Sequence, residues 1–153
     1  MEEKEWTIDT YVLYKAADVE WSAIMFLGNV RKRHKVAFDL EAHIEIEYRT
    51  CIETTQTQNK PGSELIKRWF ADVVAKKARI FHSGKLPVKH EKALRELGFD
   101  DDDLPFVAVC RRTTSRLLVS EDSDYTDAIK DYLVQKMGIR VLTIAEAEEE
   151  SAQ

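Results

Sequence analysis

Short apolar runs alternate with longer amphipathic patterns along almost the whole chain, and this alternation constrains the fold most strongly. The clearest run is Leu117-Leu118-Val119, which has no polar alternation and is typical of a strand buried on both faces. Strands that alternate with helices form a parallel sheet that is covered by helices on both sides. The sequence therefore predicts an α/β fold, a three-layer sandwich with a central parallel sheet.

The expected elements follow from hydrophobic periodicity and from residues that begin or end helices. Ser63 stands where a helix would be capped, and Gly98 and Gly138 stand where helices would end. Strands are predicted at residues 6–9, 35–38, 117–119 and 140–144. Helices are predicted at residues 19–33, 41–53, from 63 to about 82, 89–97, 105–110 and 125–137, with a loop at 54–62.

Length and composition fit one domain. The chain has 153 residues, of which 44% are hydrophobic, enough to fill a core. We expect a single domain over residues 1–147, followed by a frayed acidic tail at 148–153. No apolar run approaches the roughly 20 residues that span a bilayer, and the acidic start lacks a secretory signal. These features predict a cytoplasmic protein with no membrane contact, in which Cys51 and Cys110 are free thiols.

Four acidic residues occupy positions that suggest a common site. Asp9 ends the first predicted strand and Asp122 follows residues 117–119, where parallel sheets bind their ligands. Asp103 opens a predicted helix. Glu47 lies beside the apolar stripe of another helix, where a carboxylate needs a partner. Taken singly, each acid is explained as a turn, cap or surface residue. Their joint order along the chain is what indicates a common site.

Read together, these segments resemble the PIN-domain family. The matching segments are Ile8-Asp9-Thr10-Tyr11-Val12-Leu13, Ile46-Glu47-Tyr48, the stretch from Asp103 to Cys110, Ser120-Glu121-Asp122-Ser123-Asp124, and Gly138 to Thr143. The resemblance spans residues 6–147. The chain departs from the family pattern at Tyr11, where Asn is usual, at Cys110, where Ala is commoner, and at Asp39, where Ser or Thr is usual.

The resemblance implies a phosphodiesterase that depends on Mg²⁺ or Mn²⁺, namely an endoribonuclease that cleaves single-stranded RNA. Its catalytic acids would be Asp9, Glu47, Asp103 and Asp122, and its metal ligands Asp9, Asp103, Asp122 and Asp124. Asp102 is the alternative to Asp103 as the third acid. Ser120 would hydrogen-bond either a carboxylate of the site or the substrate phosphate. Arg111 and Arg112 would contact the substrate, and Lys67 and Arg68 are further candidates for a basic rim. Many small bacterial members are toxins held by an antitoxin protein, so an antitoxin and a homodimer are the expected protein partners.

The formal net charge of −5 does not exclude a nucleic-acid substrate. Four glutamates lie within residues 146–150 and four acids would face metal ions, so the remaining surface is net positive. A haloacid-dehalogenase-like phosphatase would need a second aspartate where Tyr11 stands, and a receiver domain would need paired acids before its acceptor aspartate. The remaining alternative is a catalytically inactive PIN-like module that binds nucleic acid or protein. His34, His43, His82 and His90 share no ligand spacing.

Overall fold

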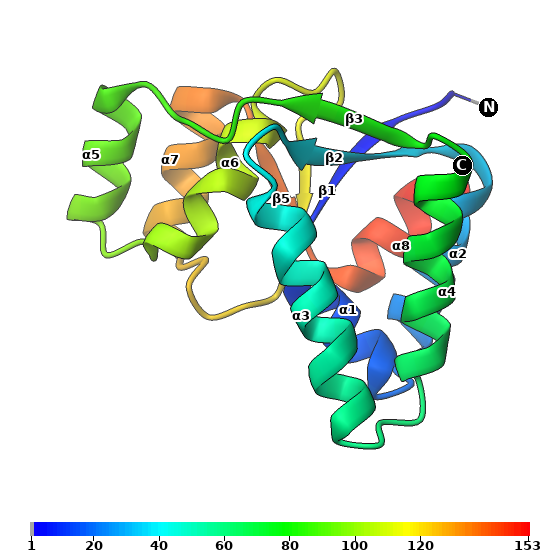
Figure 1. Cartoon of the computed structure of the whole chain (residues 1–153). Coiled ribbons are helices and arrows are strands. Elements are labelled where there is room, and N and C mark those ends of the chain that lie inside the picture. Colours follow the sequence, from blue (N-terminus) through cyan, green and yellow to red (C-terminus); the bar gives the residue numbers. More distant parts are fainter. Residues whose placement is uncertain (1) are drawn as a thin grey trace.

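The computed structural model describes residues 2–153 and forms a five-stranded parallel sheet between two layers of helices (Figure 1). The strands are β1 (Glu5–Ile8), β2 (Lys35–Asp39), β3 (Arg79–His82), β4 (Leu117–Val119) and β5 (Arg140–Leu142), in the order β3-β2-β1-β4-β5. The helices are α1 (Thr10–Ala17), α2 (Trp21–Arg33), α3 (His43–Thr57), α4 (Ser63–Ala75), α5 (Val88–Glu96), α6 (Leu104–Cys110), α7 (Asp127–Met137) and α8 (Ile144–Ala152). The predicted α/β sandwich with a parallel sheet is confirmed.

Strand β1 lies at the centre of the sheet. β1 pairs in parallel with β2 on one side and with β4 on the other, where Ile8 is opposite Val119. All three residues of β4 are buried, as the continuous apolar run predicted. α6 packs against β1, β2 and β4, with α5 and α7 on the same side, and α2, α4 and α8 cover the other side (Figure 1). Parallel pairing places the carboxyl ends of β1 and β4 next to each other.

Three elements were absent from the sequence prediction, namely helix α1, strand β3 and the C-terminal helix α8. Helix α1 follows β1 directly, and strand β3 lies where the helix from Ser63 was expected to continue. That helix ends at Ala75, and Lys77 adopts a left-handed backbone with φ of 54°. β3 is an edge strand whose residues are at most partly buried, so it lacks the apolar run that marks β4. The prediction of one helix from 63 to about 82 is therefore wrong.

The start of α4 also differs from the prediction. Ser63 does not cap the helix, because Gly62 occupies the cap position and no side chain supplies the hydrogen bond. A Cβ atom at residue 62 would lie 2.2 Å from the backbone oxygen of Ala16. The close approach of this turn to the end of α1 therefore requires glycine.

The C-terminal residues are folded, so the expectation of a frayed tail is wrong. They form α8, which begins with a capping box in which Thr143 accepts a hydrogen bond from the backbone of Glu146 at 3.1 Å, and Glu146 accepts one from Thr143. Ile144, Ala147 and Ser151 are buried, and the helix packs along α2. The glutamates lie between these buried positions, so their charge does not prevent the helix from packing. None of the helices within residues 2–153 is long and apolar enough to cross a membrane.

We predict that Thr143→Ala destabilises the protein by about 1 kcal/mol, because the first turn of α8 loses its side-chain cap. Thr143→Ser keeps the hydroxyl and serves as the matched control. Urea unfolding of the three proteins measures the difference. Equal stability of the alanine variant and the wild type would show that the Thr143 cap does not stabilise α8.

Candidate metal centre

A cleft of about 640 Å³ opens at the carboxyl edge of the sheet, and the predicted acids line it. Asp9 follows β1, Asp122 and Asp124 follow β4, Glu47 projects from α3, and Asp103 precedes α6. The other lining residues are Thr10, Tyr11, Tyr14, Lys15, Asp18, His43, Ile46, Thr50, Asp100 and Asp102. Five acids from distant parts of the sequence therefore share one cavity, as the strand-end argument predicted.

Asp9 is the most buried of these acids, with only 4% of its surface exposed. It occupies the N-cap position of α1, but its side chain makes no capping bond. Ser120 Oγ donates to Asp9 Oδ2 at 2.5 Å and itself accepts from the backbone of Asp122 at 3.0 Å. Burial raises the pKa of Asp9 to about 6; the Ser120 hydrogen bond opposes this rise, and the charges of Asp122 and Glu47 add to it.

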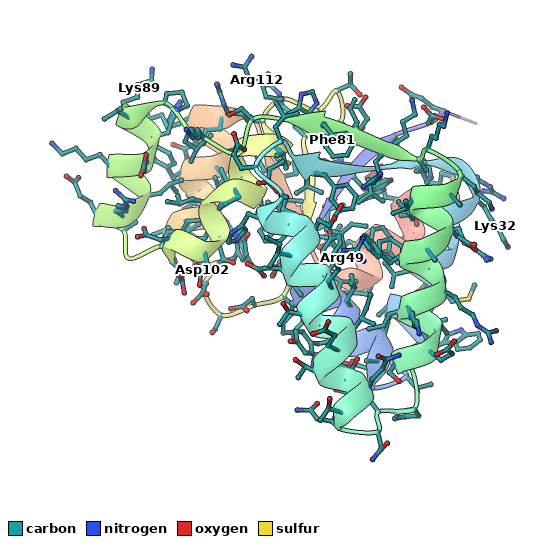
Figure 2. The ribbon with its side chains drawn as sticks, in the orientation of Figure 1. Lys32, Arg49, Phe81, Lys89, Asp102 and Arg112 are labelled. Carbon is teal, nitrogen blue, oxygen red and sulfur yellow. The ribbon has the colours of Figure 1, made fainter. Side chains whose placement is uncertain are left out.

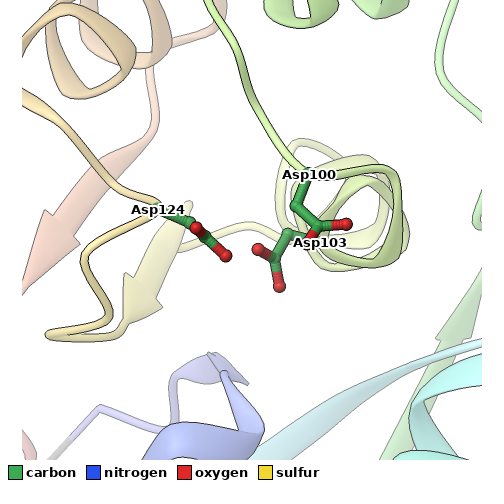
Figure 3. A group of neighbouring side chains, drawn as sticks. All are labelled: Asp100, Asp103 and Asp124. Atoms are coloured by element: carbon green, nitrogen blue, oxygen red, sulfur yellow. The ribbon is translucent and has the colours of Figure 1, made fainter.

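Asp103 lies in the middle of the tightest acidic group. Carboxylate oxygens of Asp100, Asp103 and Asp124 lie within 4.8 Å of one another, and Asp124 reaches across from the loop after β4 (Figure 3). The pKa of Asp103 is raised to about 9, first by burial, then by the charge of Asp9 and by Asp124, with which it shares a hydrogen bond. Three carboxyl groups at this distance favour either a retained proton or a bound cation.

Glu47 differs from the other acids because protein groups hold both of its oxygens. Thr10 Oγ1 donates to Oε1 at 2.9 Å, and His43 Nε2 donates to Oε2 at 2.7 Å. His43 Nε2 also lies 3.0 Å from the backbone oxygen of Asp102. The carboxylate is therefore fixed in orientation at the wall of the cleft.

Sequence reasoning missed His43 as a site residue because it considered histidines only as metal ligands. The available signal was the spacing of His43 and Glu47, four residues apart, which places both on one face of a helix. Asp100 was also assigned no role, yet the turn Asp101–Asp103 brings it beside Asp103. Asp102 lines the cleft, but its side chain is not part of the tight group, which favours Asp103 as the third acid.

The predicted substrate contacts do not lie at this cleft. Arg111 and Arg112 follow the far end of α6 and precede β4, so they lie at the amino-terminal edge of the sheet. Figure 2 shows Arg112 beyond one end of α6 and Asp102 near the other. Lys67 and Arg68 on α4 line other hollows. The assignment of these four cations to the rim is wrong, since none of them lines the cleft. Arg111 and Arg112 are misplaced because a helix that packs against parallel strands carries its two ends to opposite edges of the sheet.

Ser120 is only 2% exposed, and its hydroxyl is bonded to Asp9. Of the two roles considered for it, the carboxylate bond is the one present. The cation that lines the cleft is Lys15 of α1, which lies 5.1 Å from the centre of the Tyr11 ring and 3.4 Å from Glu20. α1 was not predicted, so its face toward the cleft could not be read from the sequence.

The chemistry of the donor set fits a hard divalent cation, which takes oxygen ligands. In the part of the chain that the structure describes, Asp9, Asp103, Asp122 and Asp124 form no ion pair with lysine or arginine. The nearby Tyr125 hydroxyl is buried and has no hydrogen-bond partner among residues 2–153. Burial and the charges of Asp9 and Asp103 raise its pKa, so it remains a donor. The site thus has unneutralised acceptors and an unused donor.

Comparisons with known proteins do not name the family. No family model matches the chain, and neither a curated protein nor a solved structure matches it.

We predict that, in the presence of a chelator, the protein loses stability as the pH rises from about 4 to 9. The pKa values of Asp9 and Asp103 rise from 3.8 to about 6 and about 9, so the folded state binds more protons than the unfolded state in this range. Folding is then favoured at low pH, and the advantage is lost as each carboxyl ionises. Asp103→Asn removes the larger part of this effect.

Thermal unfolding at pH 5 and pH 9 measures it. We expect Asp103→Asn to exceed the wild type at pH 9 by roughly 2–4 °C or more, the shift that about 1 kcal/mol produces in a chain of this size. Asp101→Asn is the control, because Asp101 is paired with Arg95 outside the cleft. An identical pH dependence in all three proteins would contradict the assignment of a strained carboxyl group to Asp103.

Proposed function

We propose that the protein is a metal-dependent phosphodiesterase of the PIN-domain kind that cleaves single-stranded RNA. One observation carries the proposal: Asp9, Asp103, Asp122 and Asp124 line one cleft at the carboxyl edge of a parallel sheet and form no ion pair with lysine or arginine among residues 2–153. Carboxylates that repel one another and face a cavity favour Mg²⁺ or Mn²⁺. The motifs that resemble PIN domains supply these same residues.

Asp103 and Asp124 would hold the ion, together with Asp9 and Asp122, and Asp100 would add a further carboxylate. When bound, such an ion activates water and stabilises charge on a phosphate group. Ser120 keeps the Asp9 carboxylate in place through its short hydrogen bond. The burial of Asp9 keeps bulk water from its inner side.

Glu47 would orient the attacking water or accept its proton. Thr10 and His43 fix its carboxylate from two sides, so it cannot turn away from the cleft. His43 would act as a positioning residue, since both groups near its Nε2 atom are acceptors and the proton therefore stays on that nitrogen. These contacts give Glu47 a role different from that of the metal-holding aspartates.

The wall of the cleft supports a single-stranded substrate. Tyr11, Tyr14 and Ile46 line it, and Tyr14 and Ile46 are 38% and 60% exposed. Exposed aromatic rings stack on unpaired bases without reading their sequence, and Lys15 would contact the backbone phosphate. Cytoplasmic action, an antitoxin partner and a homodimer remain predictions from the family resemblance.

Substitution of Asp9 and of the aspartates before α6 allows a sharp test of the metal site. Asp9→Asn and Asp103→Asn should each lower Mn²⁺-dependent cleavage of single-stranded RNA by about 100-fold, as the loss of one preorganised electrostatic group does. Asp101→Asn should leave it unchanged. Asp100→Asn should weaken Mn²⁺ binding several-fold, because it removes one carboxylate of the tight group, while keeping the oxygen that accepts from the backbone of Asp102.

For each variant, RNA cleavage is measured with and without EDTA, and Mn²⁺ affinity is measured by calorimetry. Cleavage that persists in excess EDTA would overturn the mechanism. Metal and RNA binding without cleavage would instead identify the inactive binding module that the sequence left open.

The aromatic wall gives an independent prediction. Tyr14→Ala should weaken binding of single-stranded RNA to the Asp9→Asn protein by about tenfold, since stacking contributes roughly 1–3 kcal/mol per base. Trp21→Ala is the control, because Trp21 is an exposed aromatic residue on α2 that lies outside the cleft. Fluorescence anisotropy with a labelled oligonucleotide measures both. If Tyr14→Ala and its control bind the oligonucleotide with equal affinity, α1 does not contact the RNA.

A further inference from the structure

A second hollow, of about 370 Å³, lies at the opposite, amino-terminal edge of the sheet. Three segments meet there: the first turn of α5, the stretch between α6 and β4, and the end of α7. The lining residues are His90, Arg111, Arg116, Val134, Gln135, Lys136, Met137 and Gly138. They include three cations and a histidine but no aspartate or glutamate, although the whole chain has a net charge of −5.

The cations of this hollow have few partners within the protein. Arg111 and Lys136 form no ion pair and no side-chain hydrogen bond among residues 2–153. The Nε atom of Arg111 is buried and has no hydrogen-bond partner in that part of the chain. Buried donors are normally satisfied, so an unused guanidinium N–H in a cationic hollow indicates an acceptor from outside the chain.

Arg116 is held over the end of α7. Its Nη1 atom donates to the backbone oxygen of Met137 at 3.3 Å. Gly138 has φ of 67°, and a Cβ atom there would lie 3.0 Å from the same Nη1. Glycine at 138 thus both ends the helix and leaves room for the guanidinium group. A cation at the end of a helix is ordinary, but that explanation accounts for Arg116 and leaves Arg111 without a partner.

His90 adds a neutral donor to the group. Its Nδ1 atom is hydrogen-bonded to the hydroxyl of Tyr132 at 2.7 Å, which leaves Nε2 for another partner. Burial and the cations Lys89 and Arg111 lower the pKa of His90. Burial, together with Arg112 and Arg116, also lowers the pKa of Arg111. The positive charges therefore repel one another, and an anion between them would relieve the repulsion.

We propose that this hollow is a phosphate-binding site formed by Arg111, Arg116, Lys136 and His90. A phosphate group offers several acceptor oxygens, and arginine forks match them geometrically. The group would belong either to an RNA backbone that extends beyond the acidic cleft or to a small phosphorylated molecule. The site does not depend on the proposed nuclease function, because it lies at the other edge of the sheet and uses none of the acids.

Calorimetric titration with inorganic phosphate and with a single-stranded oligoribonucleotide, both in EDTA, tests the site. Without a divalent cation the acidic cleft repels phosphate, so binding under these conditions reports on the basic hollow. We expect Arg111→Gln and Lys136→Gln to weaken phosphate binding by about tenfold and at least about threefold, respectively, as loss of charge-assisted hydrogen bonds does. The NMR signals of the His90 ring should shift on phosphate addition.

Arg95→Gln is the matched control, because it removes one positive charge from a residue already paired with Glu91 and Asp101. Lys136 is exposed, so Lys136→Gln tests the site even if Arg111→Gln fails to fold. If phosphate alone binds as tightly as the oligonucleotide, the ligand is a small phosphorylated molecule. If the oligonucleotide binds more tightly and Lys136→Gln lowers the salt dependence by about one counterion, the ligand is RNA.

Absence of phosphate binding, or equal binding by Lys136→Gln and Arg95→Gln without a shift of the His90 signals, would overturn the proposal.

Discussion

The hydrogen bond from Ser120 to Asp9 joins the ends of the neighbouring strands β1 and β4, and the acidic cleft depends on it. The backbone N–H of Asp9 donates to Val119 at 3.1 Å, which extends the pairing of β1 and β4 to the residue where the site begins. Asp9 and Ser120 then follow adjacent parallel strands, so their side chains meet at 2.5 Å. Ser120 also accepts from the backbone of Asp122, which sets the direction of the following loop. Strand register thereby positions the acids.

The same arrangement has a cost in stability. Burial of a carboxylate is unfavourable unless hydrogen bonds or charges compensate. Among the cleft acids within residues 2–153, only Asp9 and Glu47 receive hydrogen bonds from serine, threonine or histidine side chains. Asp103 and Asp124 meet each other instead, and the pKa of Asp103 rises to about 9 as a result. A fold that held these acids for stability alone would place a lysine or arginine among them. The crowding is understandable if a ligand supplies the missing positive charge.

The sequence predicted those parts of the fold that leave a periodic or positional trace. The buried run 117–119, the glycine-ended helices and the acids after strands all had such a trace, and the structure places the acids in one cleft. β3 and α8 have weaker sequence patterns. β3 is a partly exposed edge strand without an apolar run, and the buried positions of α8 are interspersed with glutamates. The neighbours Lys15, His43 and Asp100 depend on how helix faces and a 3-10 turn are oriented, which spacing alone does not determine.

The misplaced arginines show how direction along a helix matters. α6 begins at the carboxyl edge of the sheet beside Asp103 and ends at the amino edge before Arg111. Residues only eight positions apart therefore belong to opposite surfaces, one acidic and one basic. This separation also explains how a chain with a net charge of −5 keeps a hollow without carboxylates. A phosphate-bearing ligand would have to pass around α6 to contact both edges. The two proposed sites are therefore separate surfaces, which a long flexible RNA would be able to bridge and a small molecule would not.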